Sequence, residues 1–113
     1  EIGSNMADAI KYIHPLDQIV YTVDFQDLLP STDASLLAVG AGSTITATKS
    51  NGDDAENNLF ARSASGKTLL ATLKNTVEGE DYLVTFLGQG TTSKQRFTRT
   101  VLFHCRKDLT GQF

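Results

Sequence analysis

Two segments near the end of the chain constrain its fold more than any other feature. In residues 79–87 and 95–103 aromatic or β-branched residues recur at alternate positions, with one exception in the second segment, and a Gly, Thr and Ser run separates the two. Alternation with period two is typical of strands that bury one face, and a short Gly-containing interval predicts a turn. We therefore expect these two segments to form a β-hairpin.

Tyr82 stands near the start of the first of these strands, three residues after Gly79. In two-sheet sandwiches a Tyr at this place often turns its hydroxyl back onto the backbone a few residues upstream, and a Gly suits the tight corner. We expect Tyr82 and Gly79 to form such a corner. The alternative is an ordinary strand tyrosine, because β-propensity alone also favours Tyr here.

Length and composition predict a single globular domain. The chain has 113 residues, of which 40% are hydrophobic and 20% charged, and it has no apolar run of about eighteen residues that would predict a membrane span. Its net charge of −3 is not that of a nucleic-acid binder. A single cysteine, Cys105, excludes a disulfide within the chain.

The two ends lack strand patterns. Residues 1–9 are expected to be a disordered tail or a remnant of cloning, with the native start at or near Met6, and residues 106–113 are expected to be a polar tail. The folded domain is then predicted to span residues 10–105.

Five further segments carry strand patterns, each bounded by Gly, Pro, Ser or Asn: 19–25, 36–39, 44–49, 59–64 and 67–73. Residues 34–39 and 69–73 could instead be helical, but each run is too short for a stable helix and lacks a capping box. Many short strands without a helix longer than a turn predict an all-β fold, a single immunoglobulin-like (fibronectin III-like) β-sandwich of about seven strands.

The last strand has one position that breaks its pattern. Arg99 falls on the face that carries Phe97, Val101 and Phe103. Either a bulge at 98–100 shifts the phase, or Arg99 lies at the rim with its stem packed and its guanidinium in water. A functional interpretation is a contact surface for an acidic partner, with Phe113 as an apolar anchor in the tail. Its candidate residues are Lys94, Arg96, Arg99, Arg106, Lys107 and Phe113.

Several motifs together resemble a family of small phage and prophage structural proteins. These motifs are Pro15-Leu16-Asp17, Tyr21-Thr22-Val23-Asp24-Phe25 leading into Leu28-Leu29-Pro30, Gly79-Glu80-Asp81-Tyr82-Leu83-Val84-Thr85, and Thr91-Thr92-Ser93 with Arg96-Phe97-Thr98 and Val101. The resemblance spans about residues 15–101. The chain departs from the family at Phe25, where Trp is frequent, and at 74–78, which replace a Gly-rich turn.

The resemblance implies an immunoglobulin-like sandwich in a tail-associated or fibre-adaptor component of a virion, synthesised in the bacterial cytoplasm. It implies no catalysis. Its partners would be other virion proteins or further copies of the chain, with no nucleic acid, membrane or small-molecule substrate. The residues that carry the resemblance are expected to determine the fold: Tyr21, Phe25, Gly79, Tyr82 and Phe97.

We predict no catalytic, metal or cofactor site. His104 and Cys105 are neighbours on a strand, so their side chains point to opposite faces and cannot pair. The ligand spacings of zinc sites are absent, and the acidic loop 51–58 lacks the Asp-x-Asp-x-Asp-Gly pattern of a calcium loop, although ion binding there stays open. Cys105 is expected to be a small buried hydrophobe.

The sequence therefore predicts a non-enzymatic assembly module of a phage or prophage particle. The alternative is a carbohydrate- or surface-binding adhesion module of the immunoglobulin-like or fibronectin III-like kind. Sugar platforms use exposed Trp or Tyr, and this chain has no Trp and three Tyr. We expect the contacts of an assembly module at 12–16, 89–94 and 106–113, segments that should be mobile in the isolated protein.

Overall fold

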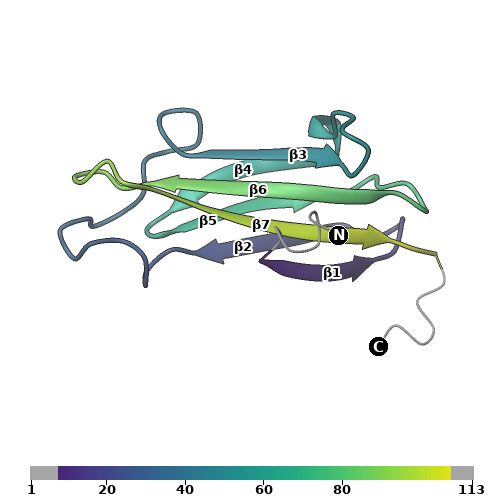
Figure 1. The fold of residues 1–113 in the computed structure, drawn as a ribbon, viewed down its shortest axis with the longest axis horizontal. Coiled ribbons are helices and arrows are strands. Elements are labelled where there is room, and N and C mark those ends of the chain that lie inside the picture. The colour runs from purple at the N-terminus through teal and green to yellow at the C-terminus, as the bar shows by residue number, and fades with distance from the viewer. Residues whose placement is uncertain (1–7, 108–113) are drawn as a thin grey trace.

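The computed structural model describes residues 8–107, which form two β-sheets packed face to face (Figure 1). One sheet has four strands in the order β1-β7-β6-β3, and the other has three in the order β2-β5-β4. The strands are β1 (Ala9–Ile13), β2 (Ile19–Asp24), β3 (Thr44–Lys49), β4 (Leu59–Ser65), β5 (Thr68–Leu73), β6 (Asp81–Gln89) and β7 (Arg96–Cys105). A single-turn 3₁₀ helix, η1 (Glu56–Asn58), precedes β4. The described part of the chain is therefore all-β, as predicted.

The core lies between the sheets and is built from alternate residues of the strands. Phe86 in β6, Phe103 in β7 and Leu69 in β5 are all essentially inaccessible to solvent, and their sequence neighbours face outward. Phe25, directly after β2, is also fully buried. Burying such side chains stabilises a fold by about 1.5–3 kcal/mol each.

The predicted hairpin is formed by β6 and β7. The two strands pair antiparallel in unbroken register from Asp81 opposite His104 to Gln89 opposite Arg96. Because the register has no bulge, Arg99 does lie on the inward face of β7 with Val101, where it is half-buried near the rim of the sandwich. The rim interpretation is correct, and the bulge at 98–100 is wrong.

The corner before β6 is present. The hydroxyl of Tyr82 accepts a hydrogen bond from the backbone N–H of Val77 at 2.9 Å, and Tyr82 is fully buried. Gly79 has φ +90° and donates its N–H to the carbonyl of Cys105 at 2.9 Å. A positive φ is unfavourable for residues with a Cβ, which explains the Gly at this position.

The strand predicted at 36–39 is wrong. The N–H of Leu36 bonds to the carbonyl of Gly66 in the turn between β4 and β5 of the three-stranded sheet, whereas the N–H of Leu37 bonds to the carbonyl of Gln89 in β6 of the other sheet. Because its hydrogen bonds are divided between two sheets, the segment forms only isolated bridges. It crosses the end of the sandwich, where Leu36 closes the core.

The strand β1, in contrast, was not predicted. It pairs parallel with β7, from Ala9 opposite Val101 to Ile13 opposite Cys105, so Ala9 belongs to the domain and not to the tail. Tyr12 and Ile13, expected in a mobile segment, lie in this strand. The pattern escaped recognition because Ile10 and Tyr12 point outward and are about half exposed, Ala9 is small, and only Ile13 is buried. The other strand bounds agree with prediction within two residues, and residues 69–73 are a strand, not a helix.

Candidate functional site

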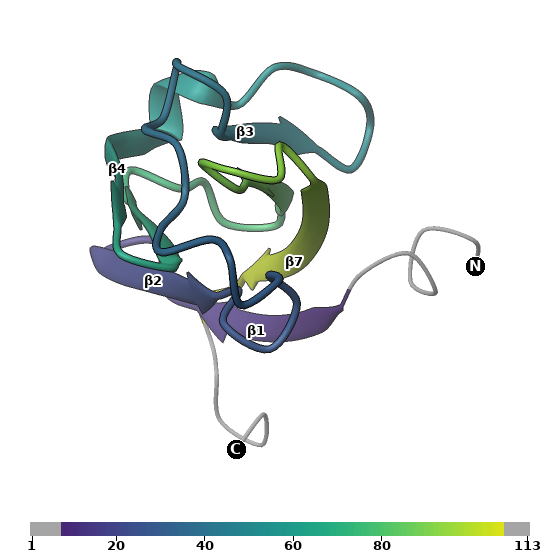
Figure 2. The same ribbon diagram turned by 90° about the vertical axis from the view of Figure 1, so that its left-hand side faces the viewer.

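The two sheets meet along two seams, seen nearly along the strands in Figure 2. We call the boundary between β3 and β4 the sealed seam, because residues 50–58 run across it. We call the boundary between β2 and the strands β1 and β7 the open seam.

The sealed seam is closed by backbone and side-chain contacts. The carbonyl of Ala47 in β3 accepts from the N–H of Ala55 at 3.1 Å, and the N–H of Ala47 donates to Oε2 of Glu56 at 2.7 Å. The other carboxylate oxygen of Glu56 accepts from Arg62 in β4 at 2.6 Å. Ala55 and Leu59 fill the interior and are buried. Both the edge of β3 and the apolar interior are thereby covered.

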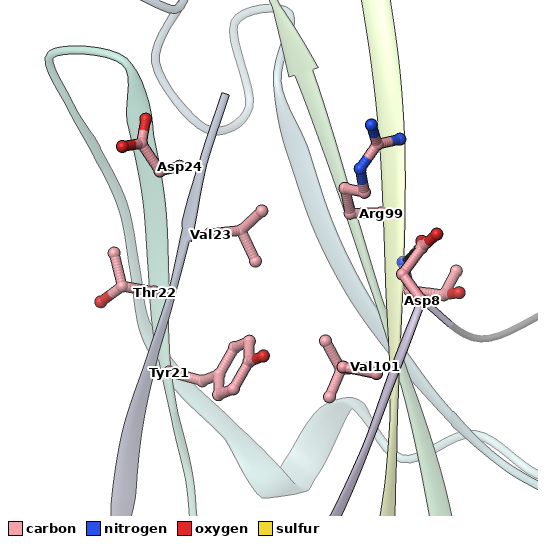
Figure 3. Close-up of a pocket in the computed structure, with 9 residues that line it drawn as sticks. Asp8, Tyr21, Thr22, Val23, Asp24, Arg99 and Val101 are labelled. Atoms are coloured by element: carbon pink, nitrogen blue, oxygen red, sulfur yellow. Dashed lines mark hydrogen bonds between the residues drawn. The ribbon is translucent and has the colours of Figure 1, made fainter. Parts of the chain in front are cut away.

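The open seam holds a cleft of about 250 Å³. Figure 3 shows Tyr21 and Val23 of β2 pointing across it toward Val101 of β7, while Thr22 points away. Arg99 of β7 and Asp8, the residue before β1, lie on the opposite wall. The remaining lining residues are Ala9, Asp24 and Thr100.

The edge of β2 at this cleft has no partner strand among residues 8–107. The N–H of Phe25 bonds to the carbonyl of Lys67, the residue directly before β5. Backbone groups alternate in direction along a strand, so the N–H and C=O groups of Val23 and Tyr21, two and four residues earlier, also point toward β5. The backbone groups of Val20, Thr22 and Asp24 therefore point outward, toward the cleft side of the sheet. These are the unpaired donors and acceptors of an exposed sheet edge.

The opposite wall is partly capped. β1 pairs with β7 only from Val101 onward, and Asp8 extends the contact by one residue: its N–H bonds to the carbonyl of Thr100, and its Oδ2 accepts from the N–H of Thr100, both at 2.8 Å. Beyond this point Nη1 of Arg99 donates to the carbonyl of Thr98 at 2.8 Å. Charged groups thus occupy part of the β7 edge, a common protection against strand pairing.

The inward residues of β2 are less buried than those of its neighbour. Tyr21 and Val23 are half-buried, although they pair directly with Ala71 and Leu69 of β5, which are 1% and 0% exposed. Tyr21 packs edge-on against Phe103 with ring centroids 5.5 Å apart. Ile19, the remaining inward residue of β2, is also only partly buried.

The predicted cationic contact surface does not form one patch. Ten residues separate Arg96 from Arg106, which is about 30 Å along extended β7. Arg99 faces inward, whereas Arg106 bonds to Asp81 at 2.9 Å. Lys94 lies in the hairpin turn with φ +64° and Lys107 at the far end of β7. Phe113 lies outside the described residues.

A polar cluster at the far end of β7 was missed. Oδ1 of Asp81 contacts both Nδ1 of His104 and Nη2 of Arg106 at 2.9 Å. The ring of Tyr12 in β1 packs against that of His104 in a tilted arrangement, with centroids 5.1 Å apart. Burial acts to raise the pKa of Asp81, but the hydrogen bonds from His104 and Arg106 outweigh it and lower that pKa. The register of β6 and β7 sets Asp81 beside His104, so the correct hairpin alignment would have revealed this pair.

A second missed residue is Asp33, whose side chain is fully buried. Its Oδ1 accepts from the N–H groups of Thr92 and Ser93 at 2.8 Å, and its Oδ2 accepts from the Ser93 hydroxyl at 2.5 Å. The hydroxyl of Ser93 in particular lowers the pKa of Asp33. The carboxylate ties the segment after β2 to the β6–β7 turn, a contact over 59 residues that no local pattern announces.

The groups considered for catalysis or metal binding serve structural contacts. Cys105 is fully buried, as predicted; its Sγ contacts Oγ1 of Thr76, and burial raises the pKa of the thiol. Asp54 accepts from the N–H of Glu56, whose own carboxylate holds the sealed seam. Within residues 8–107 no three His, Cys, Asp or Glu side chains are placed to hold a metal ion together. In the same range no helix has the length and apolar character to cross a bilayer.

Within residues 8–107 the open seam thus combines a strand edge without a partner strand and a partly apolar cleft. Comparisons of this chain with models of known protein families and with curated proteins found no match.

Proposed function

We propose that this chain is a non-enzymatic assembly module of a phage or prophage particle, built on an immunoglobulin-like sandwich, and that it binds another virion protein through the open seam. The observation that carries this proposal is the free edge of β2, with the outward backbone groups of Val20, Thr22 and Asp24 next to half-buried Tyr21 and Val23. Edge pairing supplies main-chain hydrogen bonds and needs no distinctive sequence motif.

Three features support the immunoglobulin-like type. The hydroxyl of Tyr82 bonds to the backbone five residues upstream, at the corner that opens the penultimate strand. The sheets contain four and three strands, and the strand order β2-β5-β4 faces β7-β6-β3. The first strand pairs parallel with the last, so the first and last strands share one sheet.

The virion setting rests on the resemblance of the sequence motifs around Tyr21, Phe25, Tyr82 and Phe97. In such a particle, a small domain without a catalytic arrangement acts by joining chains. The open seam provides this capacity in a domain whose other seam is already closed by its own loop.

The test is to co-express the chain with the neighbouring genes of its own operon and to purify the particles or complexes that form. We expect the chain to co-purify with a neighbouring structural protein. A variant that ends at Lys107 keeps Arg106 and its contact with Asp81. This variant should bind as well as the full chain, because it retains all the strands that border the open seam. Absence of the chain from purified particles, together with no binding to any neighbour, would refute the assembly function.

One observation favours the adhesion module as a second candidate. Tyr12 is 45% exposed on the outer face of β1 and packs at a tilt against His104, beside the polar pair of Asp81 and Arg106. An exposed aromatic ring next to hydrogen-bonding groups is a feature of sugar platforms. Specific retention on a glycan array, lost in Tyr12→Ala and retained in the matched surface variant Phe60→Ala, would favour this function.

A further inference from the structure

We propose that the occupant of the open seam is an extended segment of a partner protein that pairs antiparallel with β2 and directs a carboxylate to Arg99. The inference rests on the proposed function, because it specifies the partner segment that the assembly module holds. It follows from three properties of the seam: its backbone groups, its apolar wall and its guanidinium.

The backbone groups require a main-chain partner. Val20, Thr22 and Asp24 direct their N–H and C=O groups outward at every second residue, the spacing at which an added strand presents its own groups. β2 already belongs to a sheet in which both pairings are antiparallel. An antiparallel addition continues that sheet and forms the more stable ladder.

The apolar wall determines which side chains the segment carries. Residues of an added strand that lie opposite Tyr21 and Val23 point to the same side of the sheet as these two, into the cleft of about 250 Å³. Aliphatic side chains there would cover the half-buried faces of Tyr21 and Val23 and contact Val101. The segment should therefore alternate, with apolar residues inward and polar residues outward.

The guanidinium of Arg99 determines the charge that the partner segment should carry. Arg99 has five N–H donors, of which one bonds to the carbonyl of Thr98. It forms no ion pair within residues 8–107 that matches those of Arg62 or Arg106. The nearby carboxylates of Asp8 and Asp24 already accept from the backbone N–H groups of Thr100 and Gln26. A carboxylate on the incoming segment could accept two parallel hydrogen bonds from the remaining N–H groups of Arg99.

The probe is a labelled peptide, acetyl-Glu-Thr-Val-Thr-Ile-Thr-amide, titrated into the full chain. In antiparallel register its Val and Ile lie opposite Val23 and Tyr21, and its Glu lies at the end of the cleft nearest Arg99. Binding is followed by fluorescence anisotropy, and the site is identified by hydrogen exchange of individual amides. We expect the amides of Val20 and Thr22 to exchange at least about tenfold more slowly at saturation.

Chemical variants of the peptide test the pairing without changing the protein. Methylation of the fourth backbone nitrogen, which faces Thr22, should weaken binding at least about tenfold, whereas methylation of the third, which faces away, should not. On the protein, Thr22→Pro removes the outward N–H and leaves the ladder with β5 intact, and Thr22→Val is its control. Equal binding by both methylated peptides, or by Thr22→Pro, would overturn the pairing.

The charge is tested separately. Arg99→Gln, and a peptide with Lys in place of Glu, should each weaken binding about threefold to tenfold, and the control Lys94→Gln should leave it unchanged. Unchanged binding in both tests would overturn the role of the carboxylate. Protection of Val20 and Thr22 that rises with protein concentration without peptide would assign the seam to a second copy and overturn a heterologous partner.

No binding of any peptide also overturns the inference. The assembly function can fail independently. If the chain binds the peptide but is absent from the particles that its operon encodes, the binding site at the open seam is supported and the function in a virion is refuted.

Discussion

The sealed seam and the open seam are built from similar strands and differ in the path that the chain takes after the edge strand. After β3, an Asn-Gly turn at 51–52 returns the chain across the sandwich, and Glu56 is brought to the N–H of Ala47. After β2, the chain crosses the end of the sandwich, and Leu36 bonds to the carbonyl of Gly66 there. One edge is therefore covered by its own loop, and the other has no partner strand in the part of the chain that the structure describes.

The two seams differ in how far their apolar side chains are covered. At the sealed seam Leu59 is 5% exposed, whereas Val23 at the open seam is half-buried and Val20 beside it is 62% exposed. Apolar area that is already covered stabilises the isolated domain. Apolar area that is still accessible can contribute only when a partner covers it. Substitutions at the two seams should therefore have different consequences.

The largest expected difference is between Leu59→Ala and Val23→Ala. Leu59→Ala leaves a cavity in a covered interior and should destabilise the domain by about 2–5 kcal/mol. Val23→Ala removes a side chain that is only half-buried and should destabilise it by about 1 kcal/mol or less. Urea denaturation measures both. Equal losses would show that the open seam is as well packed as the sealed one.

A second comparison concerns the carboxylates at the two seams. Glu56→Ala leaves the N–H of Ala47 without its acceptor and removes the contact with Arg62, for an expected loss of about 1–3 kcal/mol. Asp8→Ala removes a hydrogen bond at the exposed start of β1, where water can replace it, for about 1 kcal/mol or less. A greater loss for Asp8→Ala would reverse the assignment of the sealed and open seams.

Tyr82→Phe provides a reference between these values, because it removes one buried hydrogen bond at a corner that belongs to neither seam. The N–H of Val77 loses its acceptor, and we expect a loss of about 1–2 kcal/mol. The denaturant midpoint gives the value, and Tyr21→Phe, at the open seam, is the matched control. A change within error for Tyr82→Phe would contradict the role of the corner.

Acid should weaken the contact between Asp33 and the β6–β7 turn. The pKa of Asp33 is lowered, above all by the Ser93 hydroxyl, so its stabilising contribution is present above the ordinary carboxyl pKa and is lost as the pH falls through the lowered value. Below about pH 4 the wild type should lose stability more steeply than Asp33→Asn. Parallel stability curves for the two proteins would remove Asp33 from the acid response.

The smallest expected effect is a gain at the sealed seam. Ala61 has φ +53° at the bulge of β4, a conformation that is unfavourable for residues with a Cβ. Ala61→Gly should relieve this strain and stabilise the domain by about 0.5–1 kcal/mol in thermal or urea denaturation. The matched change Ala64→Gly, in the same strand, should destabilise it. A loss for both would show that the bulge is not strained.

Local patterns in the sequence predicted the strands whose two faces differ in character. In β6, β7 and β5 the large residues fall on the inward face, and the corner at Tyr82 follows from the same alignment. Strand β1 was missed because Ile10 and Tyr12 point outward and only Ile13 is buried, so its two faces differ little in character. The segment 36–39 was misassigned because a short apolar run does not reveal where its hydrogen bonds go.

The candidate site could be predicted only in part. Alternation placed Arg99 among the apolar residues of β7 and left it at the rim, which is where it lines the cleft. The free edge of β2 depends on strand order, and strand order is determined by contacts distant in the sequence. For the same reason the buried carboxylate of Asp33, which binds groups 59 and 60 residues away, gave no local signal.

The parallel pairing of β1 with β7 also determines when the domain can be completed during synthesis. The N–H of Thr100 bonds to Asp8 over 92 residues, and β1 has no other strand partner in residues 8–107. During synthesis on the ribosome, β1 therefore has no partner strand until β7 has emerged. Until then the inner sides of β2 and β6 are exposed along the same boundary, and premature pairing with other chains is the characteristic risk for such an intermediate. Once the last strand is in place, Asp8 and Arg99 occupy part of its edge and the intermediate no longer exists.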